Sequence, residues 1–170
     1  MRKFKLVGAA ALMSLASLSF ASSETFTATV NAISDSSIAQ TTALHFGAMQ
    51  PTTGSICNMD STGIITGACD ASNGNIALGV VTVSGLIANT PLNVTVSGSS
   101  GSNVTFEPIV DIQNAAAAHN AINDGTLTSV TTNGTGDDLT INVYGAMTVD
   151  TALTPGQAYT ADYLVDVNFQ

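Results

Sequence analysis

The sequence predicts an all-β protein that folds as a β-sandwich. Stretches in which polar and apolar residues alternate recur along the chain, and Thr, which favours strands, is abundant. Groups of turn-forming residues, such as 34–37, 98–102 and 155–156, separate these stretches at short intervals. Short strands between regularly spaced turns are typical of a sandwich, and we expect about eight to nine of them.

The clearest predicted strand closes the chain. From residue 159 onward the odd positions are apolar or aromatic, and the even positions are polar except for Leu164. The odd set is Tyr159, Ala161, Tyr163, Val165, Val167 and Phe169. A period of two places one set on each face of a strand, so we expect a half-buried strand that needs a sheet. Gly156 belongs to the turn that precedes it.

A second alternating stretch covers residues 24–33. One face carries Phe26, Ala28, Val30 and Ala32, and the other carries Thr and Asn. The polar residues 34–37 separate this stretch from the rest of the chain. Two interpretations stay open, because residues 24–33 are suited either to be the first strand of a self-sufficient monomer or to reach another molecule.

The N-terminus predicts export. A basic start is followed by an apolar run over residues 6–20 and by the small-x-small site Ser19-Phe20-Ala21. This pattern indicates a signal peptide, residues 1–21, because the run is shorter than the roughly 20 residues of a membrane span. We expect an N-terminal extension over 22–37, a single domain over 38–170, passage through the periplasm to the cell surface, and no later membrane insertion.

The charge distribution excludes several classes of partner. The chain has three basic residues, Arg2, Lys3 and Lys5, and all lie in the predicted signal peptide. The mature chain therefore has twelve acidic residues and no Lys or Arg. Nucleic acids, phosphate ligands and anionic lipids are bound largely through Lys and Arg, so none of them is an expected partner.

Two cysteines, Cys57 and Cys69, flank a stretch that reads as a hairpin. Two cysteines in an exported chain are expected to pair. In the chain-entropy model, closing so short a loop stabilises the fold by roughly 3 kcal/mol. A redox or metal role is the alternative, but no third or fourth soft ligand lies nearby in the sequence.

No catalytic pattern is present, and we expect that the protein is not an enzyme. The sequence lacks nucleophile-elbow, metalloprotease, phosphate-loop and dinucleotide motifs, and His45 and His119 lie far apart. We expect no cofactor. Calcium is the one ion considered, with oxygens from Asp60 and Asp70 or from Asp137 and Asp138, but neither pair has the spacing of a calcium loop.

Three further features predict local structure. Pro108 is expected to break its strand or to place it at an edge of the sheet. Gly145 is expected to mark a bulge or bend. Residues 114–121 are expected to form one helical turn on the surface.

Segments at both ends resemble secreted pilin-like domains. Leu44-His45-Phe46-Gly47 resembles the LxFG motif of the archaic chaperone–usher pilins of the spore-coat-protein-U type. Residues 143–147, the spacer to 155–156 and residues 159–169 are similar to the closing segment of that group. The DUF4402 family of exported bacterial proteins has nearly the same layout. The middle third of the chain is similar only in style, and a local Cys57–Cys69 pair departs from the pilin pattern.

This resemblance implies an immunoglobulin-like fold that lacks one strand. A neighbouring subunit's N-terminal extension would supply that strand, and a chain of subunits would form a fimbria for adhesion or biofilm. Phe26, Ala28, Val30 and Ala32 would then be the donor residues. Gly156 and the penultimate Phe169 match the family's closing pattern. A periplasmic chaperone and an outer-membrane usher are the implied partners. The alternative is a monomeric secreted or surface-bound module that binds carbohydrate or mediates adhesion.

Overall fold

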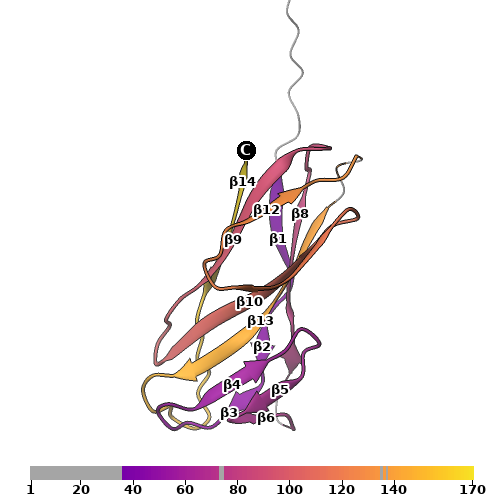
Figure 1. The fold of residues 1–170 in the computed structure, drawn as a ribbon. Helices are drawn as coiled ribbons and strands as arrows, with labels where there is room; N and C mark the ends of the chain where they lie inside the picture. Colours follow the sequence, from indigo (N-terminus) through magenta and orange to yellow (C-terminus); the bar gives the residue numbers. More distant parts are fainter. Residues whose placement is uncertain (1–35, 73–74, 135, 137) are drawn as a thin grey trace, which may run out of the picture. The chain divides into compact units, whose positions relative to one another are not determined.

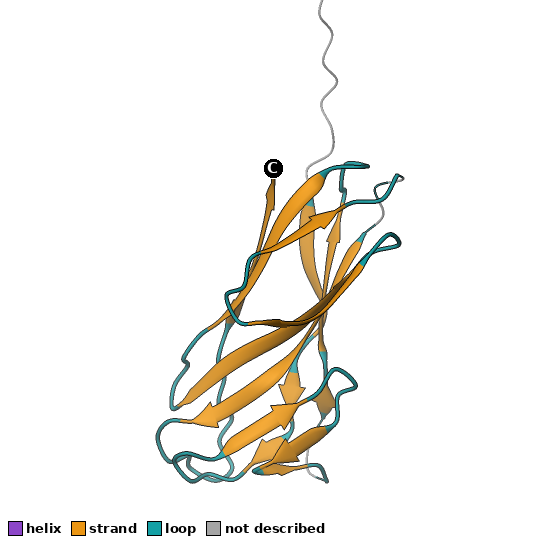
Figure 2. Ribbon diagram, in the orientation of Figure 1, coloured by secondary structure: helices purple, strands orange, loops and turns teal. Residues whose placement is uncertain are grey.

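The computed structural model describes residues 36–72, 75–134, 136 and 138–170. These residues form strands joined by loops, and no helix occurs among them (Figures 1 and 2). None of them therefore provides a helix that could cross a membrane. The predicted all-β sandwich is confirmed. The predicted signal peptide and residues 24–33, with Phe26, Ala28, Val30 and Ala32, lie outside the described residues.

A seven-stranded antiparallel sheet forms one layer. Its main order is β1-β8-β13-β10-β11, and a hairpin of β4 and β5 extends it, with β4 paired to β13. These strands are β1 (Ser37–Thr42), β4 (Ile56–Met59), β5 (Ile65–Gly67), β8 (Gly79–Ser84), β10 (Val104–Gln113), β11 (Ala118–Asn123) and β13 (Leu139–Val149). Figure 1 shows β10 and β13 side by side along their length, in agreement with their ten-residue register.

A three-stranded antiparallel sheet forms the second layer, in the order β12-β9-β14. Its strands are β9 (Pro91–Gly98), β12 (Thr128–Thr131) and β14 (Tyr163–Phe169). Two short ladders complete the fold, one between β2 (His45–Phe46) and β7 (Ile76–Ala77) and one between β3 (Ala48–Met49) and β6 (Cys69–Asp70). These four two-residue strands account for most of the excess over the eight to nine strands that the sequence predicts.

The core lies between the two sheets and is mainly aliphatic. Its largest fully buried side chains are Phe106, Leu92, Ile112, Leu139, Ile141, Val83, Val94, Val104, Val110, Val130, Val143 and Val149. Alternate residues of β8 and β9 are buried, as a period of two requires. An aromatic chain crosses from one layer to the other, because the Phe106 ring lies 5.7 Å from that of Phe46 and 6.0 Å from that of Tyr163, both edge to face.

Gly145 does not form the expected bulge. The register between β10 and β13 passes through the pair Pro108↔Gly145 without a shift. A Cβ added at Gly145 would lie 2.2 Å from the Glu107 carbonyl oxygen, so glycine is required by the close approach of two backbones. The edge placement expected for Pro108 is partly correct. The β10 strand is unbroken there, but its pairing with β11 begins only at Ile109, so the missing N–H costs no hydrogen bond on that side.

The expected helical turn at 114–121 is also wrong, because β11 (Ala118–Asn123) begins within it. A carboxylate explains the difference. Asp111 on β10 is buried, and it accepts a hydrogen bond of 2.8 Å from the Ala121 N–H and one of 2.9 Å from the Tyr144 hydroxyl. Burial, supported by the bond to Asp111, raises the pKa of Tyr144 to about 12. These long-range bonds hold the Ala-rich segment as a strand.

Ala121 adopts a left-handed backbone conformation, with φ of 54°, at the point where the β10–β11 register shifts. This conformation costs an L-residue roughly 1–2 kcal/mol, and glycine avoids that cost. We expect Ala121→Gly to stabilise the protein by up to about 1 kcal/mol, after the entropy cost of glycine is subtracted.

The measurement is urea unfolding of both proteins. Ala118→Gly is the matched control, because Ala118 lies in the same strand without a positive φ. We expect this control to lose about 0.5–1 kcal/mol. Equal destabilisation by both variants would contradict the assignment of strain to Ala121.

Candidate functional site

The closing strand is shorter than the sequence predicts. It begins at Tyr163 and not at Tyr159. Tyr159 instead accepts a hydrogen bond of 2.9 Å from the Thr154 N–H at its hydroxyl oxygen, across the turn that contains Gly156. Gly156 has φ of 81° there, which favours glycine. Ala161 packs against the core but precedes the strand.

The alternation within β14 is as predicted. Tyr163, Val165 and Val167 are half-buried and pack against the core, while Leu164 on the other face is 67 % exposed. Phe169 belongs to the core-facing set, yet it is 43 % exposed. The apolar face of this strand is therefore turned toward the core but is incompletely covered.

One edge of β14 has no partner strand within the described part of the chain. Its seven residues pair with β9, from Tyr163↔Gly98 to Phe169↔Leu92. On the opposite side the sheet ends. An edge of this kind presents unpaired backbone N–H and C=O groups and is a template for another strand.

The β1 strand is a second free edge, and it is an element that the sequence does not reveal. It ends the larger sheet, pairs with β8 and is exposed along all six residues. Ile38 is paired with the fully buried Val83, so both point toward the core, but Ile38 is 48 % exposed. The sequence from Ser37 to Thr42 lacks clear alternation, which is why it gives no strand signal.

A hydrogen bond joins the edge strands β1 and β14 at one end of β14. The Gln40 Nε2 atom donates to the Tyr163 hydroxyl oxygen at 2.9 Å, and this is the one hydrogen bond that links β1 to β14 among the described residues. Burial raises the pKa of Tyr163, and the bond from Gln40 opposes this rise. We call the core-facing residues along these edges the open strip; they are Ile38, Gln40, Tyr163, Val165, Val167 and Phe169.

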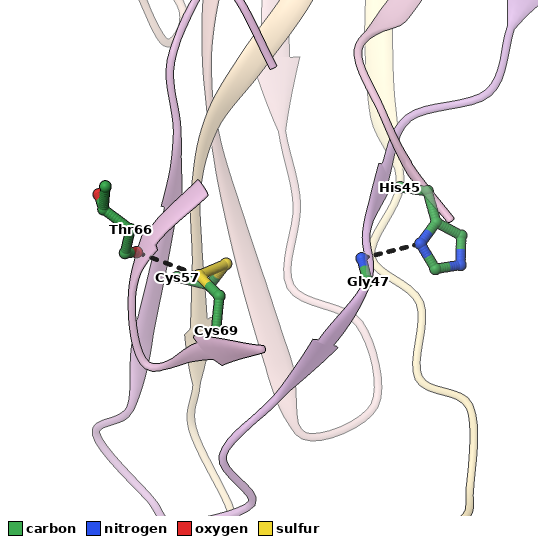
Figure 3. The surroundings of a disulfide bond; sticks show 5 residues. All are labelled: His45, Gly47, Cys57, Thr66 and Cys69. Atoms are coloured by element: carbon green, nitrogen blue, oxygen red, sulfur yellow. Dashed lines mark hydrogen bonds between the residues drawn. A yellow bond between two sulfur atoms is a disulfide. The ribbon is translucent and has the colours of Figure 1, made fainter. Parts of the chain in front are cut away.

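The cysteines form the predicted disulfide. Cys57 on β4 and Cys69 on β6 have Cα atoms 5.2 Å apart, and Cys57 is fully buried (Figure 3). The expected hairpin is also present, since Cys57 pairs with Gly67. Because β6 pairs with β3, the bond ties that short ladder to the hairpin of the larger sheet. Neither β4 nor β6 pairs with β1 or β14, so the disulfide is not part of the open strip.

Two of the residues considered for calcium, Asp60 and Asp70, accept hydrogen bonds within their own turns. Asp60 accepts hydrogen bonds from Thr62 and Ile64, and Asp70 accepts them from Ser72. Asp137 lies outside the described residues. In the described ranges no three His, Cys, Asp or Glu residues form a group that would hold a metal ion.

The histidines and one surface hollow complete the candidates. His45 is exposed, as expected from its place between Leu44 and Phe46, and its Nδ1 atom accepts a hydrogen bond from the Gly47 N–H (Figure 3). A shallow hollow beside β4 and β10 is lined in part by Asn58, Glu107 and Asp124.

Comparison with known proteins does not assign the chain to a family. The sequence matches no protein-family model, and no curated protein matches it significantly. The open strip is therefore judged on its own geometry.

Loss of the disulfide is expected to change the stability of the protein. We expect replacement of both cysteines, Cys57→Ala with Cys69→Ala, to lower the free energy of unfolding by about 3 kcal/mol, because a loop of 12 residues is no longer closed. Urea unfolding of the two proteins measures this difference. An unchanged stability would contradict a structural role for the bond.

The Asp60 turn predicts a dependence on pH. Hydrogen bonds to the Asp60 carboxylate hold its pKa below the usual value of 3.8, and the bond from the Thr62 hydroxyl has the largest effect. At pH values above the usual pKa, the charged Asp60 carboxylate therefore stabilises the folded protein. This contribution is lost as the pH falls through the lowered pKa. We expect Asp60→Asn to lose less stability than the wild type on acidification. Urea unfolding at neutral and acidic pH tests this, and equal losses in both proteins would contradict it.

Proposed function

We propose that this protein is a structural subunit of an extracellular bacterial fibre, assembled by strand donation between subunits. The observation that carries the proposal is the free edge of β14, whose core-facing side chains are only half covered. An extended segment laid along this edge would pair its backbone and bury its apolar face in one step.

The strand order supports an immunoglobulin-like sandwich that lacks its last strand. In that fold, strands A, B, E and D form one sheet, and C, F and G form the other. Taken in chain order, β1, β8, β9, β10, β13 and β14 correspond to A, B, C, D, E and F by their pairing. No described strand occupies the place of G, which would be the free edge of β14. The strands β11 and β12 are additions between D and E.

The segment at residues 24–33 has the properties of the missing strand. Phe26, Ala28, Val30 and Ala32 alternate with polar residues and match the period of β14. Complete burial of a side chain such as Phe or Val contributes about 1.5–3 kcal/mol. Several of these contributions, with main-chain hydrogen bonds, would outweigh the ordering of a short segment.

Export and charge agree with such a fibre. A subunit with a free strand edge needs protection before assembly, so we propose a periplasmic chaperone and an outer-membrane usher as partners. Twelve acidic residues and no Lys or Arg in residues 22–170 suit a chain that works outside the cell. These partners are suggested by the pilin resemblance and by the exposed edge together.

Deletion of residues 22–33 tests the proposal. We expect the truncated protein to be exported but to give neither fibres in negative-stain microscopy nor an SDS-resistant ladder on unheated gels. The full chain should give both, because the donated strand is held by burial and backbone pairing.

A matched pair of variants tests whether assembly depends on the apolar face of residues 24–33 or only on the length of this segment. Phe26→Ser with Val30→Ser should abolish the ladder, whereas Thr25→Ser with Thr29→Ser should retain it, since these Thr residues lie on the opposite face. Fibres formed by the truncated protein would refute the proposal. A stable wild-type monomer that binds glycans would favour the alternative binding module.

A further inference from the structure

All sulfur-containing side chains beyond the predicted signal peptide gather around the disulfide. Met147 on β13 is directly opposite Cys57 on β4, and Met49 on β3 is directly opposite Cys69 on β6. Met59 follows Cys57 by two residues on β4, and both are buried. The disulfide joins β4 to β6, and Figure 1 shows these strands and β3 at the same end of the sandwich. We call these residues the sulfur cluster; they are Met49, Cys57, Met59, Cys69 and Met147.

The register places one methionine beside each cysteine of the bond. Directly opposed residues of antiparallel strands share a face, and their Cβ atoms lie roughly 4.5–5.5 Å apart. Met147 therefore faces the core between Cys57 and Phe106, its partners on the two neighbouring strands. Met49 lies on the same face of its short ladder as Cys69. Both cysteines thus have a thioether as a direct cross-strand neighbour.

Burial divides the cluster into protected and accessible sulfurs. Cys57 is fully buried and Met59 is 3 % exposed. Met49, Cys69 and Met147 pack against the core but are only partly buried. An oxidant in solution therefore reaches the two partly buried methionines and the Cys69 side of the disulfide before it reaches Met59.

The composition of the chain leaves few other targets for a two-electron oxidant. Lysine amines consume part of the hypochlorous acid in most proteins, but residues 22–170 contain no lysine. Two histidines and three tyrosines are present, and these side chains react more slowly with hypochlorous acid than a thioether does. A thioether is polarizable and is readily oxidised to the sulfoxide. The accessible methionines are therefore the first expected targets.

We propose that Met49 and Met147 form a sacrificial oxidation site that protects the disulfide from hypochlorous acid. Each of them lies beside one of the bonded cysteines and is more accessible than the buried sulfurs of the cluster. Oxidation here replaces a permanent lesion with a repairable one, because methionine sulfoxide can be reduced again whereas cysteine sulfonic acid cannot. Neither methionine belongs to the open strip, so this inference does not depend on the proposed fibre.

The reaction at each methionine is a two-electron oxidation. The thioether sulfur attacks the chlorine of hypochlorous acid and releases hydroxide. Water then adds to the sulfur, chloride leaves, and two protons are lost, one of which neutralises the hydroxide. The net products are the sulfoxide, chloride and one proton. The two electrons that the sulfur loses reduce the chlorine to chloride, so no further reactant is needed.

Peptide mapping of the wild-type protein tests the order of reaction. The protein is mixed rapidly with two molar equivalents of hypochlorous acid, one for each accessible thioether. Pepsin fragments are then read by mass spectrometry, since residues 22–170 offer trypsin no site. We expect sulfoxide at Met49 and Met147 to exceed that at Met59 by roughly tenfold, with the disulfide intact. Equal oxidation of Met59, or loss of the disulfide at this dose, would overturn the inference.

Leucine variants test whether the two thioethers protect the bond. Met49→Leu with Met147→Leu nearly conserves side-chain volume, so urea unfolding should remain cooperative. We expect the same dose to oxidise the Cys57–Cys69 bond at least about threefold more than in the wild type, because the competing thioethers are gone. Met59→Leu is the matched control and should react as the wild type does, since Met59 is buried. Equal oxidation of the bond in the wild type and the double variant would overturn the protective role.

Discussion

The structure depends on a backbone that is paired on one side only. The smaller sheet has three strands against seven in the larger one, and within the described part of the chain one of its edge strands, β14, pairs with β9 alone. Buried backbone groups need partners, and an uncovered apolar face remains in contact with water at a cost. Both conditions meet along β14, whose free edge and half-covered side chains would be satisfied by one further strand. The open strip is thus a direct result of how the sandwich is built.

The other parts of the fold stabilise the sandwich without closing this strip. The disulfide ties a short ladder to the hairpin of β4 and β5, and the buried Asp111 holds β11 in a strand with a register shift. A shifted edge strand pairs poorly with another chain, whereas β14 pairs with β9 over seven residues without a shift. The edge strands β11 and β14 therefore differ in the regularity of their pairing.

The bond between Gln40 and Tyr163 connects the fold to the proposed assembly. It joins the two layers at one end of the strip, and the side chains around it are closely packed.

The sequence by itself determined the all-β class, the disulfide and the alternating face of β14, because a period of two and a pair of cysteines are local signals. It did not reveal β1, whose residues lack alternation, and it predicted a bulge at Gly145 and a helical turn at residues 114–121. Those features depend on contacts between distant residues: a backbone approach at Glu107, a carboxylate at Asp111, and pairing with β8. Only the tertiary structure decided that the closing strand keeps one edge free of the other described residues, because pairing is a property of neighbours in space.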